Sequence, residues 1–276
     1  MSDYRQNYGD ASMSTTVALV QLEVSDRQTE GVRRRDAAAA VQTAADEGAA
    51  LVMLPELWPS GAFNTDAMAE RDARDFTEFV AFVTETAASA GVWLHGGSDV
   101  EVGPDGRRFN TAVIADSGGE VVARYRKQYL WGGDEGEAAV LDAGTELLTI
   151  PTPLGTTGIA TCYELRFPEL FRALVDRGAQ TYAIASGWPA ARIEHWRTLL
   201  RARAIENQSW VLGVNCVGNH NGVQMGGYSA VINPWGEVIT EGSADTAEIL
   251  YADVDPETVE MWRSKFGWLA DRKPCC

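Results

Sequence analysis

Lysine is scarce in this 276-residue chain. It occurs only at Lys127, Lys265 and Lys273, and the remaining positive charges are arginines. Two interpretations stay open: a GC-rich genome that favours arginine codons, or a salty cytoplasm in which an acidic surface stays solvated. Under both interpretations Lys127, which lies well inside the chain, stands out as a candidate for chemistry.

Positive charge is also outnumbered, because 23 Lys and Arg residues face 39 Asp and Glu residues, which gives a formal net charge of −16. A surface with this charge repels phosphate backbones and anionic lipid headgroups. We therefore expect neither nucleic acid nor a membrane surface as a partner.

Cysteine and histidine are too few, and too scattered, for a disulfide framework or a zinc site. The four cysteines lie at positions 162, 216, 275 and 276 without CxxC spacing, and the three histidines lie at positions 95, 195 and 220. We expect no metal and no cofactor, and a reducing cytoplasmic location fits the cysteine usage best.

Long apolar runs are missing as well, since no stretch approaches the roughly 18 consecutive apolar residues of a membrane-spanning helix. The first residues lack the basic-then-apolar pattern of a signal peptide. We expect a disordered lead-in over residues 1–14, in which Met13 is a candidate natural start, and a short tail over residues 273–276.

Short apolar runs rich in β-branched residues recur along the chain, and several are apolar throughout. This pattern suits strands buried on both faces, or sheets stacked on each other. We expect strands over residues 15–24, 50–57, 92–100, 110–116, 121–127, 156–163, 181–186, 210–218, 227–234 and 248–255.

Helical patterns lie between these runs, over residues 26–47, 66–90 and 192–208, and a further helix-like stretch follows Cys162. The order is β-α-β-α-β-β-β, repeated once, and no linker divides the chain. The sequence therefore predicts one α/β domain with two sheets face to face and helices outside.

Three polar residues stand where strand patterns end: Glu56, Lys127 and Cys162. Ligands of α/β proteins bind beyond the carboxyl ends of strands. Taken singly, each residue has an ordinary interpretation: a buried hydrophobic thiol, a solvated glutamate or an edge lysine. Their shared position at strand ends favours a common site.

The chemistry of the three groups is coherent. A thiol attacks as its thiolate and needs a base, which Glu56 can supply. Lys127 and the backbone N–H of Tyr163 can stabilise the oxyanion of a tetrahedral intermediate. We therefore interpret Cys162 as a nucleophile.

The sequence resembles the nitrilase superfamily of carbon–nitrogen hydrolases, and the resemblance covers about residues 15–272. It is carried by "LPELWPSG", "YRKQYLW" and "GIATCYELRFPE", in the family's Glu–Lys–Cys order, and by "WPAARIEHW" and "GYSAVINPWGEVI". The resemblance implies an αββα sandwich, a thioester on Cys162 and a homodimer or larger homo-oligomer.

The family also carries a second glutamate after the lysine. Its spacing to Gly144 favours Glu137, and Glu135 stays an alternative. Ala139 and Val140 stand where the family commonly has aromatic residues.

Substrate-binding candidates surround the cysteine. Tyr163 follows it, and Trp188 either lines the pocket or packs in the core. Arg166 either pairs with a buried carboxylate or supports the site, and Arg192 is a second candidate cation. We interpret His195 as structural, Cys216 as a core residue, and the set Arg201, Arg203, Glu206 and Asn207 as a helix ion-pair network.

The leading functional hypothesis is a thiol amidohydrolase acting on a small linear amide, with an ω-amide of a short keto-dicarboxylate as the best candidate, because "CYELRFPE" and "WPAARIEHW" most resemble the ω-amidase branch. Alternatives are a nitrilase or an N-carbamoyl amidohydrolase. Nitrile-cleaving members usually have Trp-Glu after the cysteine, whereas this chain has Tyr163-Glu164. A non-catalytic scaffold is the alternative from another class.

Overall fold

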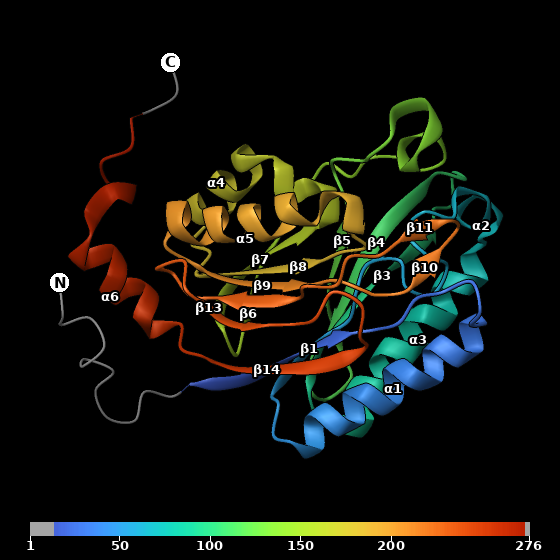
Figure 1. The fold of residues 1–276 in the computed structure, drawn as a ribbon, viewed down its shortest axis with the longest axis horizontal. Coiled ribbons are helices and arrows are strands. Elements are labelled where there is room, and N and C mark those ends of the chain that lie inside the picture. Colours follow the sequence, from blue (N-terminus) through green and yellow to red (C-terminus); the bar gives the residue numbers. More distant parts are fainter. Residues whose placement is uncertain (1–13, 274–276) are drawn as a thin grey trace.

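Two sheets stacked face to face form the centre of the molecule, and helices cover both outer faces (Figure 1). The computed structural model describes residues 14–273. The expected lead-in and tail therefore lie outside the described residues, except for Ser14 and Lys273. The αββα arrangement confirms the predicted fold class.

The first sheet has six strands in the order β14-β1-β2-β3-β4-β5, with parallel pairing from β1 to β3 and antiparallel pairing elsewhere. Its strands are β1 (Thr15–Gln21), β2 (Leu51–Met53), β3 (Trp93–Val102), β4 (Arg108–Ala115), β5 (Val121–Arg126) and β14 (Glu248–Val254).

The second sheet has the order β13-β12-β9-β8-β7-β6, and β7, β8 and β9 are parallel. Its strands are β6 (Thr149–Thr152), β7 (Gly155–Thr161), β8 (Thr181–Ala185), β9 (Trp210–Val214), β12 (Ala230–Ile232) and β13 (Val238–Glu241). A separate short hairpin joins β10 (Asn219–His220) to β11 (Val223–Gln224).

The helices divide between the two outer faces. α1 (Glu30–Asp46) and α3 (Ala73–Ala90) cover the first sheet, and α4 (Pro168–Asp176) and α5 (Ile193–Asn207) cover the second (Figure 1). α2 (Thr65–Glu70) precedes α3, and α6 (Glu257–Lys265) lies beyond the sandwich near the C-terminal end. Within residues 14–273, no helix combines the length and apolarity that crossing a membrane requires.

The layers follow from alternation along each strand. In β1, Val17 and Leu19 join the core between the two sheets, whereas Ala18 and Val20 pack with α1 and α3. A third apolar cluster lies between the second sheet and its helices, where Tyr182 packs with residues of α4 and α5. Apolar side chains buried at the three interfaces between the four layers therefore hold the sandwich together.

The predicted helix over residues 66–90 is wrong as a single element. Arg71 has an extended ψ of 143°, which ends α2, and Asp72 then forms a capping box with Asp75 that starts α3. α1 likewise begins at Glu30 rather than at residue 26, because the side chain of Thr29 caps its first turn.

Several strands differ from the sequence-based expectation. β2 ends at Met53, two residues before Pro55, which has no N–H to donate to a sheet. β9 ends at Val214, so Cys216 is buried core but not part of the strand. The sequence patterns missed β6, β10, β11, β13 and α6.

Candidate active site

Glu56 lies three residues beyond β2 and is only 2% exposed. Its Oε1 accepts hydrogen bonds from Lys127 Nζ at 2.7 Å and from Asn110 Nδ2 at 2.8 Å. Its Oε2 accepts from the backbone N–H of Gly187 at 3.0 Å. A carboxylate held by three donors has a fixed orientation, which a general base requires.

Lys127 follows β5 directly and is 1% exposed. Besides Glu56, its Nζ donates to Glu137 Oε2 at 2.7 Å. Glu137 is buried, whereas Glu135 is exposed two residues away. The structure therefore places Glu137, not Glu135, against the lysine.

Asn110, which the sequence patterns did not single out, connects the two glutamates. Its Nδ2 donates to Glu56 Oε1 and, at 2.7 Å, to Glu137 Oε1. Its backbone carbonyl accepts from the backbone N–H of Lys127 at 2.9 Å. The only signal in the sequence was an amide side chain at the start of an otherwise apolar strand pattern.

Cys162 begins a 3₁₀ turn, Cys162–Arg166, directly after β7. Its φ of 46° is uncommon for a residue with a side chain and indicates a sharp strand-to-helix corner. Thr161 and Glu164 cap the turn reciprocally. The N–H of Tyr163, at the second position of the turn, has no acceptor within the helix and is free to face a ligand.

The electrostatics keep the resting thiol protonated. Burial raises the pKa of Cys162, and the nearby Glu56 carboxylate raises it further, while Lys127 opposes both. Burial alone would disfavour the ammonium of Lys127, but Glu137 and Glu56 outweigh it and hold that pKa well above its ordinary value. Because the charge of Glu56 opposes a thiolate beside it, ionisation of the thiol is favoured only as Glu56 takes the proton and becomes neutral.

Burial also raises the pKa of Glu137, although Lys127 works against this effect. The same cause raises the pKa of Glu164 to about 7.

Among the described residues, no group of three or more histidine, cysteine or acidic side chains is placed to hold a metal ion.

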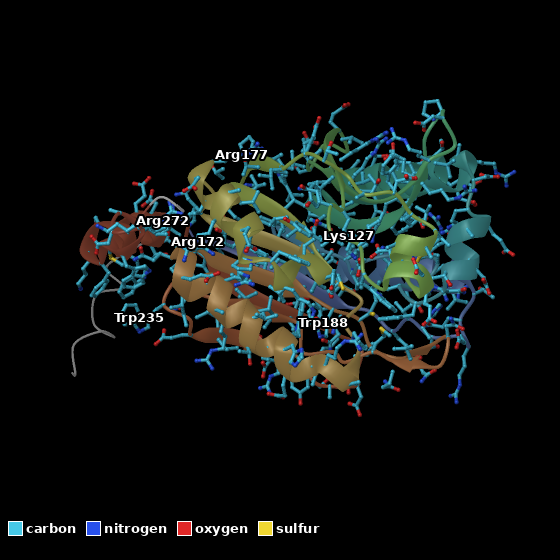
Figure 2. All side chains as sticks on the ribbon, turned by 90° about the horizontal axis from the view of Figure 1, so that it is seen from above. Lys127, Arg172, Arg177, Trp188, Trp235 and Arg272 are labelled. Atoms are coloured by element: carbon cyan, nitrogen blue, oxygen red, sulfur yellow. The ribbon has the colours of Figure 1, made fainter. Side chains whose placement is uncertain are left out.

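A pocket of about 340 Å³ opens above Cys162. Tyr163, Trp188, Arg166 and Arg192 all line it, together with Phe63, Trp131, Gly132, Gly187 and Pro189. Trp188 also packs against Trp196, with ring centroids 5.6 Å apart, so both interpretations of Trp188 hold. Lys127 and Trp188 lie in the central part of the molecule, away from Trp235 and Arg272 near its α6 end (Figure 2).

The expectation that Arg166 pairs with a buried carboxylate is wrong. Its guanidinium carbon lies 4.7 Å from the ring centre of Trp188 and 5.8 Å from that of Tyr163, and Nη1 lies 3.2 Å from His195 Nδ1. No acidic residue is among those that line the pocket. Arg166 is therefore held by aromatic faces and lines the pocket with its charge unneutralised there, whereas Arg192 is exposed.

The helix network is confirmed only in part. Arg203 pairs with Glu206 at 2.8 Å and also donates to the carbonyl of Leu165, within the turn that Cys162 begins. Arg201 instead donates to the carbonyl of Gly236. His195 is exposed, and its contact with Arg166 places it beside the pocket rather than in the core.

Comparisons with known proteins agree with this geometry. The family model described as carbon–nitrogen hydrolase matches residues 16–264. The 2-oxoglutaramate amidase of Paenarthrobacter nicotinovorans is 36% identical over 230 residues, which are 81% of this chain and 78% of that protein.

Solved structures give the same picture. Nit3 of Saccharomyces cerevisiae, a member of branch 10 of the nitrilase superfamily, superposes with a TM-score of 0.82 at 29% identity, covering 92% of this chain and 94% of that one. A mutant amidase from Nesterenkonia sp. AN1, whose active-site cysteine carries the product of Michael addition of acrylamide, gives a TM-score of 0.80 at 26% identity, covering 93% and 99%.

Proposed function

This chain belongs to the carbon–nitrogen hydrolase family, within the ω-amidase-like part of the nitrilase superfamily, and from that premise we propose that it hydrolyses a small ω-amide through a thioester on Cys162. Its general class follows from the family: it is an amidase that acts on C–N bonds other than peptide bonds. The convergence of Glu56, Lys127 and Glu137 beside the Cys162 thiol carries the proposal.

In the acylation half-reaction, Glu56 takes the thiol proton and the sulfur attacks the amide carbon. Lys127 Nζ and the N–H of Tyr163 stabilise the oxygen that becomes negative, and one such donor is typically worth about 3–4 kcal/mol. Glu56 then gives its proton to the amide nitrogen, the C–N bond breaks, and ammonia leaves the thioester.

In the deacylation half-reaction, Glu56 accepts a proton from a water molecule as that water attacks the thioester carbon. The C–S bond breaks, the proton returns to the sulfur, and the carboxylic acid leaves. Glu137 and Asn110 hold Lys127 and Glu56 in place during both steps, because their hydrogen bonds join the two groups.

We propose an ω-amide of a short keto-dicarboxylate as the substrate. Its distal carboxylate needs a cation away from the reacting carbon, and a guanidinium binds carboxylate through two parallel hydrogen bonds. Arg166 and Arg192 line the pocket and are the two candidates, while Lys127 is committed to the oxyanion. The name of the relative from Paenarthrobacter nicotinovorans supports this substrate class.

The remaining parts of the proposal concern the setting of the enzyme. We propose one catalytic domain over residues 15–272 that needs no cofactor and no metal, in a cytoplasmic homodimer or larger homo-oligomer. The family resemblance supports the assembly, and the scarcity of cysteine supports the reducing location.

Two alternatives within enzymes, a nitrilase and an N-carbamoyl amidohydrolase, use the same three groups. Tyr163 after the nucleophile favours the amidase over the nitrilase. A non-catalytic scaffold would have no need to bury an ion cluster whose desolvation costs several kcal/mol per charge, roughly.

The test measures ammonia release from the ω-amide of a short keto-dicarboxylate and from an isostere in which the distal carboxylate is replaced by a neutral group. Both compounds are assayed on wild type and on the variants Arg166→Met and Arg192→Met. Charge-assisted bonds of about 1.5–3 kcal/mol predict that losing the binding arginine raises KM for the acid about 10- to 150-fold. The neutral isostere should change far less. If wild type prefers the neutral amide, the carboxylate assignment fails and an aliphatic amide or carbamoyl substrate replaces it.

A further inference from the structure

Glu164 is a fully buried carboxylate, two residues after Cys162, that the mechanism above does not use. Its Oε1 accepts hydrogen bonds from Tyr125 Oη at 2.8 Å and from the backbone N–H of Gln128 at 2.7 Å. Its Oε2 accepts from the backbone N–H of Thr161 at 2.7 Å. A buried charge held by three good donors has one defined position.

These donors come from both sheets. Tyr125 is on β5 and Gln128 directly follows Lys127, so both belong to the end of the first sheet that carries the ammonium. Thr161 is the last residue of β7 in the second sheet and directly precedes Cys162. One carboxylate thus accepts hydrogen bonds both from residues close to Lys127 in the chain and from the residue that precedes the nucleophile.

The catalytic groups need a link between the two sheets because they do not all come from the same sheet. Glu56 and Lys127 follow strands of the first sheet, whereas Cys162 follows a strand of the second. The sheets meet through one cluster of apolar side chains, to which Leu19 of the first sheet and Leu212 of the second both belong, and apolar contact has no preferred direction. Hydrogen bonds between the sheets therefore have to set how the ammonium and the thiol face each other.

We propose that Glu164 is a positioning residue that fixes the Lys127 ammonium relative to the Cys162 thiol across the two sheets. The proposal rests on the proposed function, because it concerns the geometry of the same reaction. A misplacement of about 1 Å between reacting groups can cost about a hundredfold in rate.

Glutamine is the informative replacement. It keeps the size of the side chain, but only one of its two terminal atoms accepts hydrogen bonds, and the other carries hydrogens. In Glu164→Gln the amide group must therefore face either the N–H of Thr161 or the donors at Gln128 and Tyr125. One sheet loses its hold on the side chain in either orientation.

Glu101→Gln is the matched control. Glu101 lies on β3 and accepts hydrogen bonds from Arg126 on β5 and Thr111 on β4, all within the first sheet. This change also removes a carboxylate that holds β5, but it breaks no bond between the sheets. If the rates of ammonia release and of cysteine labelling fall only in Glu164→Gln, the cause is the lost hydrogen bond between the sheets.

Two rates are measured on each variant: ammonia release, and covalent addition of acrylamide to Cys162 followed by mass spectrometry. For Glu164→Gln we expect kcat to fall about a hundredfold with KM changed less than about threefold, and acrylamide addition to slow at least about tenfold. Glu101→Gln should stay within about threefold of wild type on both. Rates for Glu164→Gln within about threefold of wild type would overturn the proposal.

The labelling rate separates positioning from simple loosening of the fold, because a loosened site exposes the thiol and speeds labelling. Faster labelling in a folded Glu164→Gln protein therefore contradicts the proposal. Labelling also needs no amide hydrolysis, because the thiol adds to the C=C bond of acrylamide. If wild type hydrolyses no amide, the proposed function fails, while the labelling rates still test the positioning role of Glu164.

If Glu164→Gln does not fold, Tyr125→Phe replaces it, because that change removes one donor and leaves the two backbone bonds in place. It should slow labelling by about fivefold relative to Glu101→Gln. A rate equal to that of the control would refute the proposal.

Discussion

Replacing Lys127 with methionine should destabilise the protein more than any exposed charge change, and the loss should depend on pH. The substitution removes the cation that neutralises Glu56 and Glu137 and leaves two carboxylates buried beside each other. Breaking a buried ion pair by removing one partner costs about 3–5 kcal/mol. At about 2–4 °C per kcal/mol, the midpoint of thermal unfolding should fall by roughly 6–20 °C.

The sign of the pH dependence follows from the carboxylates that remain. Without the ammonium, burial and mutual repulsion raise the folded-state pKa of the pair above the unfolded value. Such groups contribute stability at low pH, and this contribution is lost as the pH rises through the folded-state pKa. The deficit of Lys127→Met relative to wild type should therefore grow from pH 5 to pH 8.

Thermal unfolding followed by circular dichroism at several pH values measures both effects. Adding Glu137→Gln to Lys127→Met should recover at least half of the lost stability, since only one carboxylate then stays buried. Arg74→Met is the control, because Arg74 and Glu78 form an exposed ion pair whose loss should not measurably move the transition. A deficit that is independent of pH, or additive losses in the double variant, would refute this account of the cluster.

Three further predictions concern the site and the assembly. Cys162→Ala should abolish ammonia release while its circular dichroism spectrum matches wild type, and residual turnover above background would remove the thiol from the mechanism. Glu137→Gln should lower kcat by at least about a hundredfold whereas Glu135→Gln stays within about twofold, since only the former touches Lys127. Sedimentation should show at least a dimer, and a monomer at moderate salt would contradict it. If the acidic surface is a salt adaptation, the dimer should strengthen with salt as the net charge of −16 is screened, whereas no change would favour the codon-usage interpretation.

The sequence was most informative where chemistry and strand periodicity coincided. Glu56, Lys127 and Cys162 each follow an apolar run, and ligands of α/β proteins bind beyond the carboxyl ends of strands, although the first two residues belong to one sheet and Cys162 to the other. Their convergence could therefore be predicted before any coordinates. The two facing sheets could be predicted as well, because several short runs are apolar throughout, as in strands buried on both faces.

The missed features depend on contacts between distant residues. The amide of Asn110 is informative only once the strands bring it between two glutamates. β6 contains Pro151, which is tolerated because β6 is the edge strand, and that position cannot be read from its four residues. Of the two interpretations of Arg166, pairing with a buried carboxylate was wrong, because the aromatic faces of Trp188 and Tyr163 hold the guanidinium instead.

The pairing of the last strand with the first has a consequence for how the chain folds during synthesis. β14 pairs with β1 from Thr15↔Val254 to Gln21↔Glu248, so the first sheet spans almost the whole chain. The second sheet is complete once residue 241 has emerged, since all its strands lie between residues 149 and 241. Until β14 arrives, β1 is an unpaired edge, and such edges favour aggregation. The last-made strand therefore closes the sheet that carries Glu56 and Lys127, and a ribosome-released chain shortened before residue 248 should populate aggregates rather than a smaller enzyme.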